Sequence, residues 1–420
     1  MNILFIMRNE LSPSTGGVER VTSTTTKIFQ KSNQNIYVIY TGIQEITEPV
    51  QHDGIKYSFL PDIKNLGSPQ NFQFIRDLIL KNGIDIAINQ NANYAIAKHL
   101  AGAGKNELKI ISCLHTPPLI PRLLFEYHLA SSFQSGLVHW AKVGLKYVLR
   151  TKLEAKYFKI YLSELLFIVG SSDATVVPAN QHIGEYRKIL PSALKANLVA
   201  INHPLSFPKQ NLELLLQNKE KIILAVSRLE RASKRIDLLL KAWSKIHRKH
   251  SDWKLVIVGG PKHIKFDDPQ FRELQKLKVL VRKLKIGNVV FVGHQDPINY
   301  YQKSSIYAMT SASEAWGMSL VEAQQFGCVP VVFQSFSALQ EIISPGENGF
   351  CVPFGDIDGF AQAISLLIDD RTMREKIASC AEKSTARFRQ EKTGKDWLHL
   401  FETMNSHSDR VLENHDLFSK

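Results

Sequence analysis

Short runs of β-branched and apolar residues alternate with longer amphipathic segments along almost the whole chain. This alternation is typical of βαβ units, in which helices cover both faces of a parallel sheet. In the first half it predicts strands at residues 3–7, 36–40, 84–88, 110–114, 174–177 and 198–201, with helices at 18–31 and 72–82. Gly83 is expected to end the second of these helices as its C-cap.

The pattern breaks around Asn202-His203-Pro204 and restarts after a polar stretch that ends near Lys219. The second half is expected to contain strands at 222–226, 254–258, 289–292, 306–309 and 329–333 and helices at 236–247, 271–285, 319–326 and 357–367. We therefore predict an α/β protein with two doubly wound, Rossmann-like domains, residues 1–203 and 204–390, and a ligand between them. A C-terminal helix within 391–420 can cross back to the first domain before a frayed tail.

Composition narrows the classes of protein. A chain of 420 residues with 44% apolar and 22% charged residues has enough material for two cores. The net charge of +13 favours an anionic partner, and nucleotide phosphates, an acidic membrane and nucleic acid all qualify. Four scattered cysteines indicate reduced thiols. No apolar run is long enough for a signal peptide or a spanning helix, so we expect a cytoplasmic protein whose membrane contact, if any, is peripheral.

The segment from Ser313 to Ala323 carries two carboxylates, Glu314 after a predicted strand and Glu322 on the helix that follows. Both are expected to accept hydrogen bonds from sugar hydroxyls. Between them, Gly317, Met318 and Ser319 open the helix, where backbone N–H groups can bind an anionic oxygen. Alone, either glutamate is equally well an exposed or helix-start residue.

Together with the Gly327-Cys-Val-Pro-Val-Val segment, this spacing resembles the signature of the retaining, GT-B-fold glycosyltransferases of family 4. The resemblance implies that Glu314 faces the transferred sugar and that Glu322 binds the ribose of the donor nucleotide. It also implies retention of the anomeric configuration. Trp316 stands where smaller or phenylalanine-like residues are usual, and we hypothesise that it shapes sugar preference.

A second cluster follows the predicted strand at 222–226, where Arg228 and Lys234 are two cations at one strand end. Such a pair can neutralise a diphosphate while the glycosidic bond breaks, and the resemblance assigns this role to both residues. Arg231 and Arg235 are expected on a solvated face. Replacement of Lys234 by alanine should abolish transfer and leave thermal stability nearly intact.

Two further candidates lie in the first half. Gly16 and Gly17 open a helix after the first strand, as a phosphate-binding loop or a plain tight turn would, and the resemblance places such a segment near the donor phosphate. Glu19 and Arg20 are expected on the helix surface. His115 follows the strand at 110–114; a lone histidine is more often structural, but its position matches a histidine that contacts the donor sugar in relatives. Residues 116–125 would then form an acceptor-side lip.

Two aspartate patterns resemble metal sites and are better explained as helix starts. Asp356-Ile-Asp358 spells a DxD string, but it follows Gly355 and opens a helix, where acidic side chains cap. Asp268, next to Pro269, has the same explanation. We therefore expect transfer without a metal or cofactor.

The stretch 137–162 places Lys142, Lys146 and Arg150 on one helical face. Such a face either binds an anionic membrane or is simply solvated. The sequence thus predicts a hexosyltransferase that uses a UDP-sugar or, second, GDP-mannose, and a saccharide or lipid-linked acceptor of surface polysaccharide or lipopolysaccharide synthesis. Alternatives are a nucleotide-sugar epimerase or α-glucan phosphorylase on the same fold, or a basic nucleic-acid-binding protein, for which recognition patterns are lacking.

Overall fold

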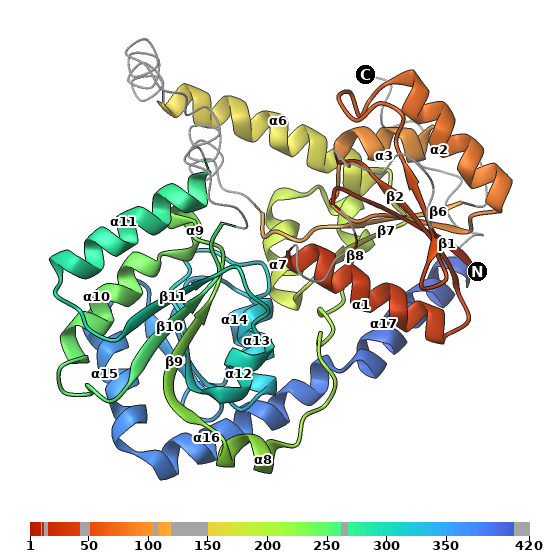
Figure 1. The fold of residues 1–420 in the computed structure, drawn as a ribbon. Helices are drawn as coiled ribbons and strands as arrows, with labels where there is room; N and C mark the ends of the chain where they lie inside the picture. The colour runs from red at the N-terminus through yellow and green to blue at the C-terminus, as the bar shows by residue number, and fades with distance from the viewer. Residues whose placement is uncertain are drawn as a thin grey trace. The chain divides into compact units, whose positions relative to one another are not determined.

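A computed structural model describes residues 1–9, 11, 16–42, 51–103, 108–118, 150–261 and 268–406 of the protein. The chain divides into two units, the first made of residues 1–201 with the chain from 394 onward, the second of residues 202–393. Each unit is built on one sheet covered by helices (Figure 1). Most of α17, from residue 394 onward, therefore belongs to the first unit although it ends the described chain.

The sheet of the first unit has the order β3-β4-β2-β1-β5-β6-β7-β8 among the described residues. Its strands are β1 (Asn2–Met7), β2 (Asn35–Tyr40), β3 (Gln51–His52), β4 (Ile55–Phe59), β5 (Ile86–Asn89), β6 (Lys109–Cys113), β7 (Ala174–Val177) and β8 (Leu198–Ala200). Every pair is parallel except β3 with β4. The order reverses between β1 and β5, which makes the carboxyl ends of these strands a topological switch point.

The helices of this unit cover both faces of the sheet because β1 is apolar on both. They are α1 (Gly17–Lys31), α2 (Pro69–Asn82), α3 (Tyr94–Ala101), α6 (Arg150–Gly170), α7 (Asn180–Ile189), the 3-10 helix η1 (Ser192–Asn197) and α17 (Gln390–Ser406). Ile3 and Phe5 of β1 share one cluster with Phe29 of α1 and Trp397 of α17, whereas Leu4 faces the opposite cluster, which α2 and α3 cover. Strand alternation thus sends successive side chains into two cores.

The sheet of the second unit has six parallel strands in the order β11-β10-β9-β12-β13-β14. They are β9 (Glu220–Val226), β10 (Lys254–Val258), β11 (Val289–Gly293), β12 (Ser304–Met309), β13 (Val329–Gln334) and β14 (Phe350–Pro353). The helices are α8 (Leu212–Gln217), α9 (Arg231–Lys234), α10 (Ile236–Ile246), α11 (Pro269–Lys283), α12 (Ile298–Lys303), α13 (Met318–Gln325), α14 (Leu339–Ile342), α15 (Ile357–Asp369), α16 (Arg371–Ser384) and the 3-10 helix η2 (Thr385–Phe388). Here the strand order reverses between β9 and β12.

The strands expected from the sequence are present to within two residues at each end, and Gly83 caps α2 in the left-handed conformation. Three strands were missed: β3 and β14 lie at sheet edges, and β14 ends in Pro353, whereas β4 is the neighbour of β3 and alternates apolar and polar residues. Edge strands lack the continuous apolar run of a buried strand and tolerate proline. The polar stretch before Lys219 contains α8, and η2 separates α16 from α17, the helix expected within 391–420.

All four cysteines are free thiols. Within the described part of the chain, no helix has the length and apolar character needed to cross a bilayer.

Candidate functional site

The loops that follow β9 and β12 meet at the switch point of the second sheet, because these two parallel strands are neighbours. The hydroxyl of Thr310, directly after β12, donates to the carbonyl oxygens of Lys234 at 3.3 Å and Arg235 at 3.0 Å. The backbone N–H of Ala312 donates to the Ser233 carbonyl at 2.6 Å. These bonds join the two loops, so the side chains they carry hold a defined separation.

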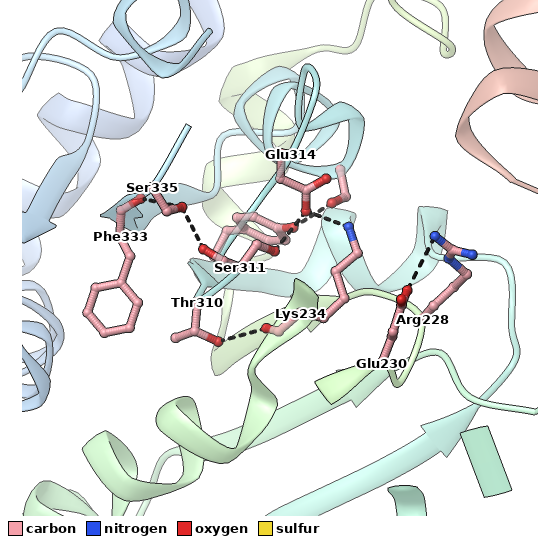
Figure 2. Close-up of polar contacts among 10 residues, drawn as sticks. Arg228, Glu230, Lys234, Thr310, Ser311, Glu314, Phe333 and Ser335 are labelled. Carbon is pink, nitrogen blue, oxygen red and sulfur yellow. Dashed lines mark hydrogen bonds and ion pairs between the residues drawn. The ribbon is translucent and has the colours of Figure 1, made fainter. Parts of the chain in front are cut away.

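An ion pair between Lys234 and Glu314 lies at the centre of this junction (Figure 2). Lys234 Nζ is 2.6 Å from Glu314 Oε1, and each side chain is 15% exposed. Ser311 Oγ donates to the same Oε1 at 2.7 Å, and the Ser311 carbonyl accepts from Ser335 Oγ at 2.5 Å. Low exposure weakens solvent screening, so the pair interacts more strongly than one on an open surface.

Arg228 presents the second cation at this edge, and it is far more open. Its side chain is 70% exposed, and Nη2 lies 3.6 Å from Glu230 Oε2, a separation too long for a strong ion pair in water. The loop itself is fixed, because the backbone N–H of Leu229 donates to Gln270 Oε1 at 3.0 Å. Arg228 is therefore a solvated guanidinium on a fixed loop, available to an anion.

Of the two further arginines expected on a solvated face, Arg231 is exposed and Arg235 departs from the expectation. Arg235 has φ +49°, a left-handed conformation that is uncommon outside glycine. It precedes α10, and its Nε and Nη2 donate to the two carboxylate oxygens of Asp237 at 3.0 and 3.3 Å. Its guanidinium is thus committed to its own helix, and the turn it makes allows α9 to end and α10 to begin.

The start of α13 has the backbone geometry expected of the Gly317 segment. Gly317 is the N-cap at φ +83°, where a side chain would be strained and a Cβ would meet Phe336 at 3.4 Å. Met318 begins the helix and Ser319 follows, with its Oγ 2.7 Å from the Tyr307 hydroxyl, so the Ser319 side chain hydrogen-bonds within the unit. The helix start keeps its N–H groups near the Glu314 loop.

Glu322 and Trp316 both lie in the interior. Glu322 is 1% exposed, and its Oε2 accepts from the Tyr301 hydroxyl at 2.9 Å. In this conformation no ribose hydroxyl can reach that carboxylate. Trp316 is 2% exposed and packs edge-on against Phe388, with ring centroids 5.0 Å apart, and near His203 at 6.1 Å. The hypothesis that Trp316 shapes sugar preference gives way to a packing role, because its ring is enclosed.

In the first unit, Gly16 precedes α1, which begins at Gly17. A Cβ on Gly16 would collide with the carboxylate of Glu19, so the small residue makes room for that side chain. Glu19 is buried and its Oε1 accepts from Asn9 Nδ2 at 2.6 Å. The expectation that Glu19 lies on the helix surface is therefore wrong. The helix period did not reveal this, because Asn9 comes from the loop after β1.

His115 follows β6 as expected and is partly buried. Burial lowers its pKa to about 4, against the opposing effect of a hydrogen bond with the Gln90 backbone. The imidazole is neutral at pH 7, so it can exchange hydrogen bonds with a sugar and adds no charge. The carbonyl of Thr116 accepts from the Tyr186 hydroxyl at 2.8 Å. The remainder of the expected acceptor lip and residues 137–149 of the basic stretch, Lys142 and Lys146 included, lie outside the described residues.

The aspartate strings act as helix caps. Asp356 Oδ1 accepts from the Gly359 N–H at 2.9 Å, and Asp358 forms an exposed ion pair with Lys245. Asp268 caps α11 in the same way. The capping prediction is confirmed for Asp356 and Asp268.

Arg228, Lys234 and Glu314, which the sequence predicts as site residues, lie at one edge of the second sheet. The hydroxyls that hold Lys234 and Glu314 were missed. Thr310 and Ser311 directly follow a strand, and Ser335 follows the next strand of the sheet. Hydroxyl residues at the carboxyl ends of adjacent buried strands are the signal that could have identified them. His115, Gly16 and Gly17 belong to the other unit.

The two sheets, each with a switch point, define a pair of Rossmann-like units, the GT-B fold. Residues 206–384, which lie within the second unit, match the family of glycosyl transferases group 1. The resemblance inferred from the two glutamates is confirmed at this level.

Curated relatives match part of the chain. An uncharacterized glycosyltransferase of Haemophilus influenzae is 28% identical over 203 residues, 48% of this chain and 54% of that protein. The amylovoran biosynthesis glycosyltransferase AmsD of Erwinia amylovora is 27% identical over 237 residues, 55% of this chain and 63% of that protein. The match thus spans little more than half the length of these relatives.

Solved structures match almost the whole chain. The lipopolysaccharide outer core galactosyltransferase WaaB has a TM-score of 0.65 at 17% identity and covers 96% of this chain and 99% of its own. Anabaena Alr3699/HepE, solved with UDP and glucose, has a TM-score of 0.68 at 15% identity, with 96% and 100% covered. These likenesses establish the shared fold.

Proposed function

We propose that the protein is a retaining glycosyltransferase that moves a sugar from a nucleotide-sugar donor, a UDP-sugar before GDP-mannose, to a saccharide or lipid-linked saccharide. The observation that carries the proposal is the Lys234–Glu314 pair beside Arg228 at the β9–β12 switch point, which combines cations with a carboxylate at one strand edge. The HepE complex with UDP and glucose supports the donor class.

In this proposal Arg228 and Lys234 bind the donor diphosphate and stabilise the negative charge that grows on it as the glycosidic bond breaks. Glu314 accepts hydrogen bonds from the transferred sugar, and the family resemblance adds His115 as a neutral sugar contact. The start of α13 at Gly317, Met318 and Ser319 adds further donor contacts, and the family resemblance adds Gly16 and Gly17. Glu322 binds ribose only if its side chain leaves Tyr301.

Transfer with retention needs no protein base in this scheme, because same-face attack lets the leaving phosphate take the acceptor proton. The cations at the diphosphate supply the charge that a metal provides in other transferases, so we propose metal-independent transfer. The anomeric configuration of the product, read by proton NMR, tests retention. Turnover in excess chelator tests whether transfer needs a metal.

The acceptor is proposed to belong to surface polysaccharide or lipopolysaccharide synthesis, which the name of the Erwinia relative supports. A peripheral contact with anionic membrane at the cytoplasmic face fits α6, where Lys152, Lys156 and Lys159 are exposed at helical spacing beside the half-exposed Ile160. Vesicles of anionic lipid should retain the protein at low salt. A variant with these three lysines changed to glutamate should no longer bind, and equal retention of both would remove membrane contact from the proposal.

The donor is tested by incubating the protein with a panel of UDP- and GDP-sugars and measuring hydrolysis, which needs no acceptor. Lys234→Ala should lose this activity. Lys245→Ala, which removes the α10 partner of an exposed ion pair with Asp358 of α15, should keep it. Absence of hydrolysis and of nucleotide binding across the panel would refute the donor class.

A further inference from the structure

We propose that Glu314 is the ion-pair partner of Lys234 in the free protein and that a nucleoside diphosphate displaces Glu314 when it binds. Donor binding then exchanges one anionic partner of Lys234 for another. This inference rests on the proposed function and adds the order of events at the same site. Before exchange, Glu314 blocks the lysine; after exchange, its carboxylate is free to accept from the sugar.

The two cations of the site differ in availability. Arg228 is 70% exposed and only loosely paired, at 3.6 Å, whereas Lys234 is 15% exposed and already paired at 2.6 Å. An incoming diphosphate can therefore meet Arg228 without breaking a strong contact. It reaches Lys234 only in competition with Glu314.

The geometry explains why exchange does not release the Glu314 side chain. Oε1 of Glu314 has two donors, Lys234 Nζ and Ser311 Oγ. Ser311 is itself fixed through its carbonyl by Ser335. When Lys234 turns to phosphate, the Ser311 hydroxyl still holds the carboxylate, and the acceptor site that Lys234 vacates on Oε1 faces the bound donor.

The backbone keeps the lysine in place during the exchange. Thr310 bonds the carbonyls of Lys234 and Arg235, and Ala312 bonds that of Ser233. Only the side chain of Lys234, with its rotatable stem, has to move. A lysine suits this task better than an arginine, whose planar fork would favour a two-bond contact with the carboxylate.

Partner exchange has a measurable consequence: the nucleotide must break the Lys234–Glu314 contact, and the energy of that contact makes the free energy of nucleotide binding less favourable. Glu314→Gln keeps the shape and the hydrogen-bond acceptor but removes the charge. Calorimetric titration with UDP, and separately with GDP, should show tighter binding to Glu314→Gln than to the unmodified protein by roughly 10-fold or more, the factor that corresponds to a charged hydrogen bond. Turnover of the sugar donor should fall in the same variant.

A matched control separates exchange from a general change in charge. Glu230→Gln removes one negative charge from the same strand edge, but its carboxylate is 50% exposed and 3.6 Å from Arg228. Because exposed pairs are weak, nucleotide affinity should change by less than about threefold.

A double variant tests the dependence on the lysine. In a Lys234→Met background, adding Glu314→Gln should change nucleotide affinity no more than Glu230→Gln does, since there is no ion pair to release. Circular dichroism checks that each variant is folded, and Glu314→Ser is the second variant if the glutamine protein is not.

The outcomes are distinct. A gain in affinity that disappears with Lys234 supports partner exchange. An equal gain in both backgrounds indicates plain repulsion between Glu314 and phosphate and overturns the exchange. No gain in affinity overturns it as well. In both cases nucleotide binding itself leaves the proposed function standing. Binding of neither UDP nor GDP by any variant overturns both.

Discussion

Lys234 and Glu314 meet from the ends of two neighbouring parallel strands, and their 2.6 Å contact is shielded on both sides, with 15% of each side chain exposed. Neither residue is near the other in sequence, and each is positioned by bonds to the opposite loop. We therefore expect a change in either residue to affect both the stability of this sheet edge and donor turnover.

Lys234→Ala is expected to lower donor turnover by about 100- to 1,000-fold, because a cation aimed at the developing charge is lost. The burial of the pair changes the expectation, drawn from sequence, that stability stays nearly intact. Glu314 would keep only Ser311 as a neutral donor, at a cost of about 1–3 kcal/mol in the free energy of unfolding. Urea denaturation measures this cost, with Lys245→Ala as the exposed control; equal unfolding of both variants would contradict it.

The pH dependence of stability should reveal the lowered pKa of the partly buried His115. Its folded-state pKa of about 4 lies below the ordinary value of 6.5. As the pH falls from 6.5 toward 4, the unfolded chain takes up a proton that the folded protein does not, so this histidine makes stability fall in that window. Above pH 6.5 it has no such effect.

The corresponding variant is His115→Asn, which is neutral at every pH used. The loss of unfolding free energy between pH 7 and 4.5 should be smaller in the variant than in the unmodified protein, by about 1–2 kcal/mol. Other histidines contribute equally to both proteins and cancel in the difference. Parallel curves for the two proteins would show that His115 titrates normally.

Trp316 is expected to matter for stability and not for sugar choice. Trp316→Ala removes an indole enclosed against Phe388 and should cost about 3–5 kcal/mol. Trp316→Phe keeps an aromatic ring at the same place and should cost less. Denaturation measures the effect on stability, and the ratio of rates with two donor sugars measures the effect on sugar choice. A changed ratio in the folded Trp316→Phe variant would show that Trp316 contributes to sugar preference.

The Tyr301–Glu322 contact can be tested against the ribose role of Glu322. Tyr301→Phe removes the hydroxyl that donates to a buried carboxylate and should cost about 1–3 kcal/mol. In a double-mutant cycle, adding Glu322→Gln should recover part of that cost, since the charge is gone.

The ligand arm of that test compares UDP with inorganic pyrophosphate, which has no ribose. If Glu322 leaves Tyr301 to bind ribose, Glu322→Gln should weaken UDP binding and leave pyrophosphate binding unchanged. Equal affinity of both proteins for UDP would assign Glu322 to the core alone.

The sequence by itself determined the number of units, most of the parallel strands of both sheets and the strand ends that are followed by Arg228, Lys234 and Glu314. These features depend on local signals, namely apolar runs, helix periods, caps such as Gly83 and Asp356, and the fixed spacing of a motif. The strand β4 and the edge strand β14 were missed because their pattern is not that of a buried strand.

Tertiary structure alone decided which polar side chains are buried and what they touch. Glu19 is enclosed by Asn9, Glu322 by Tyr301 and Trp316 by Phe388, and in each case the partner comes from another segment of the chain. The pairing of Lys234 with Glu314 is of the same kind. Long-range contacts of single side chains leave no period in the sequence, because they depend on where strands and loops are placed in three dimensions.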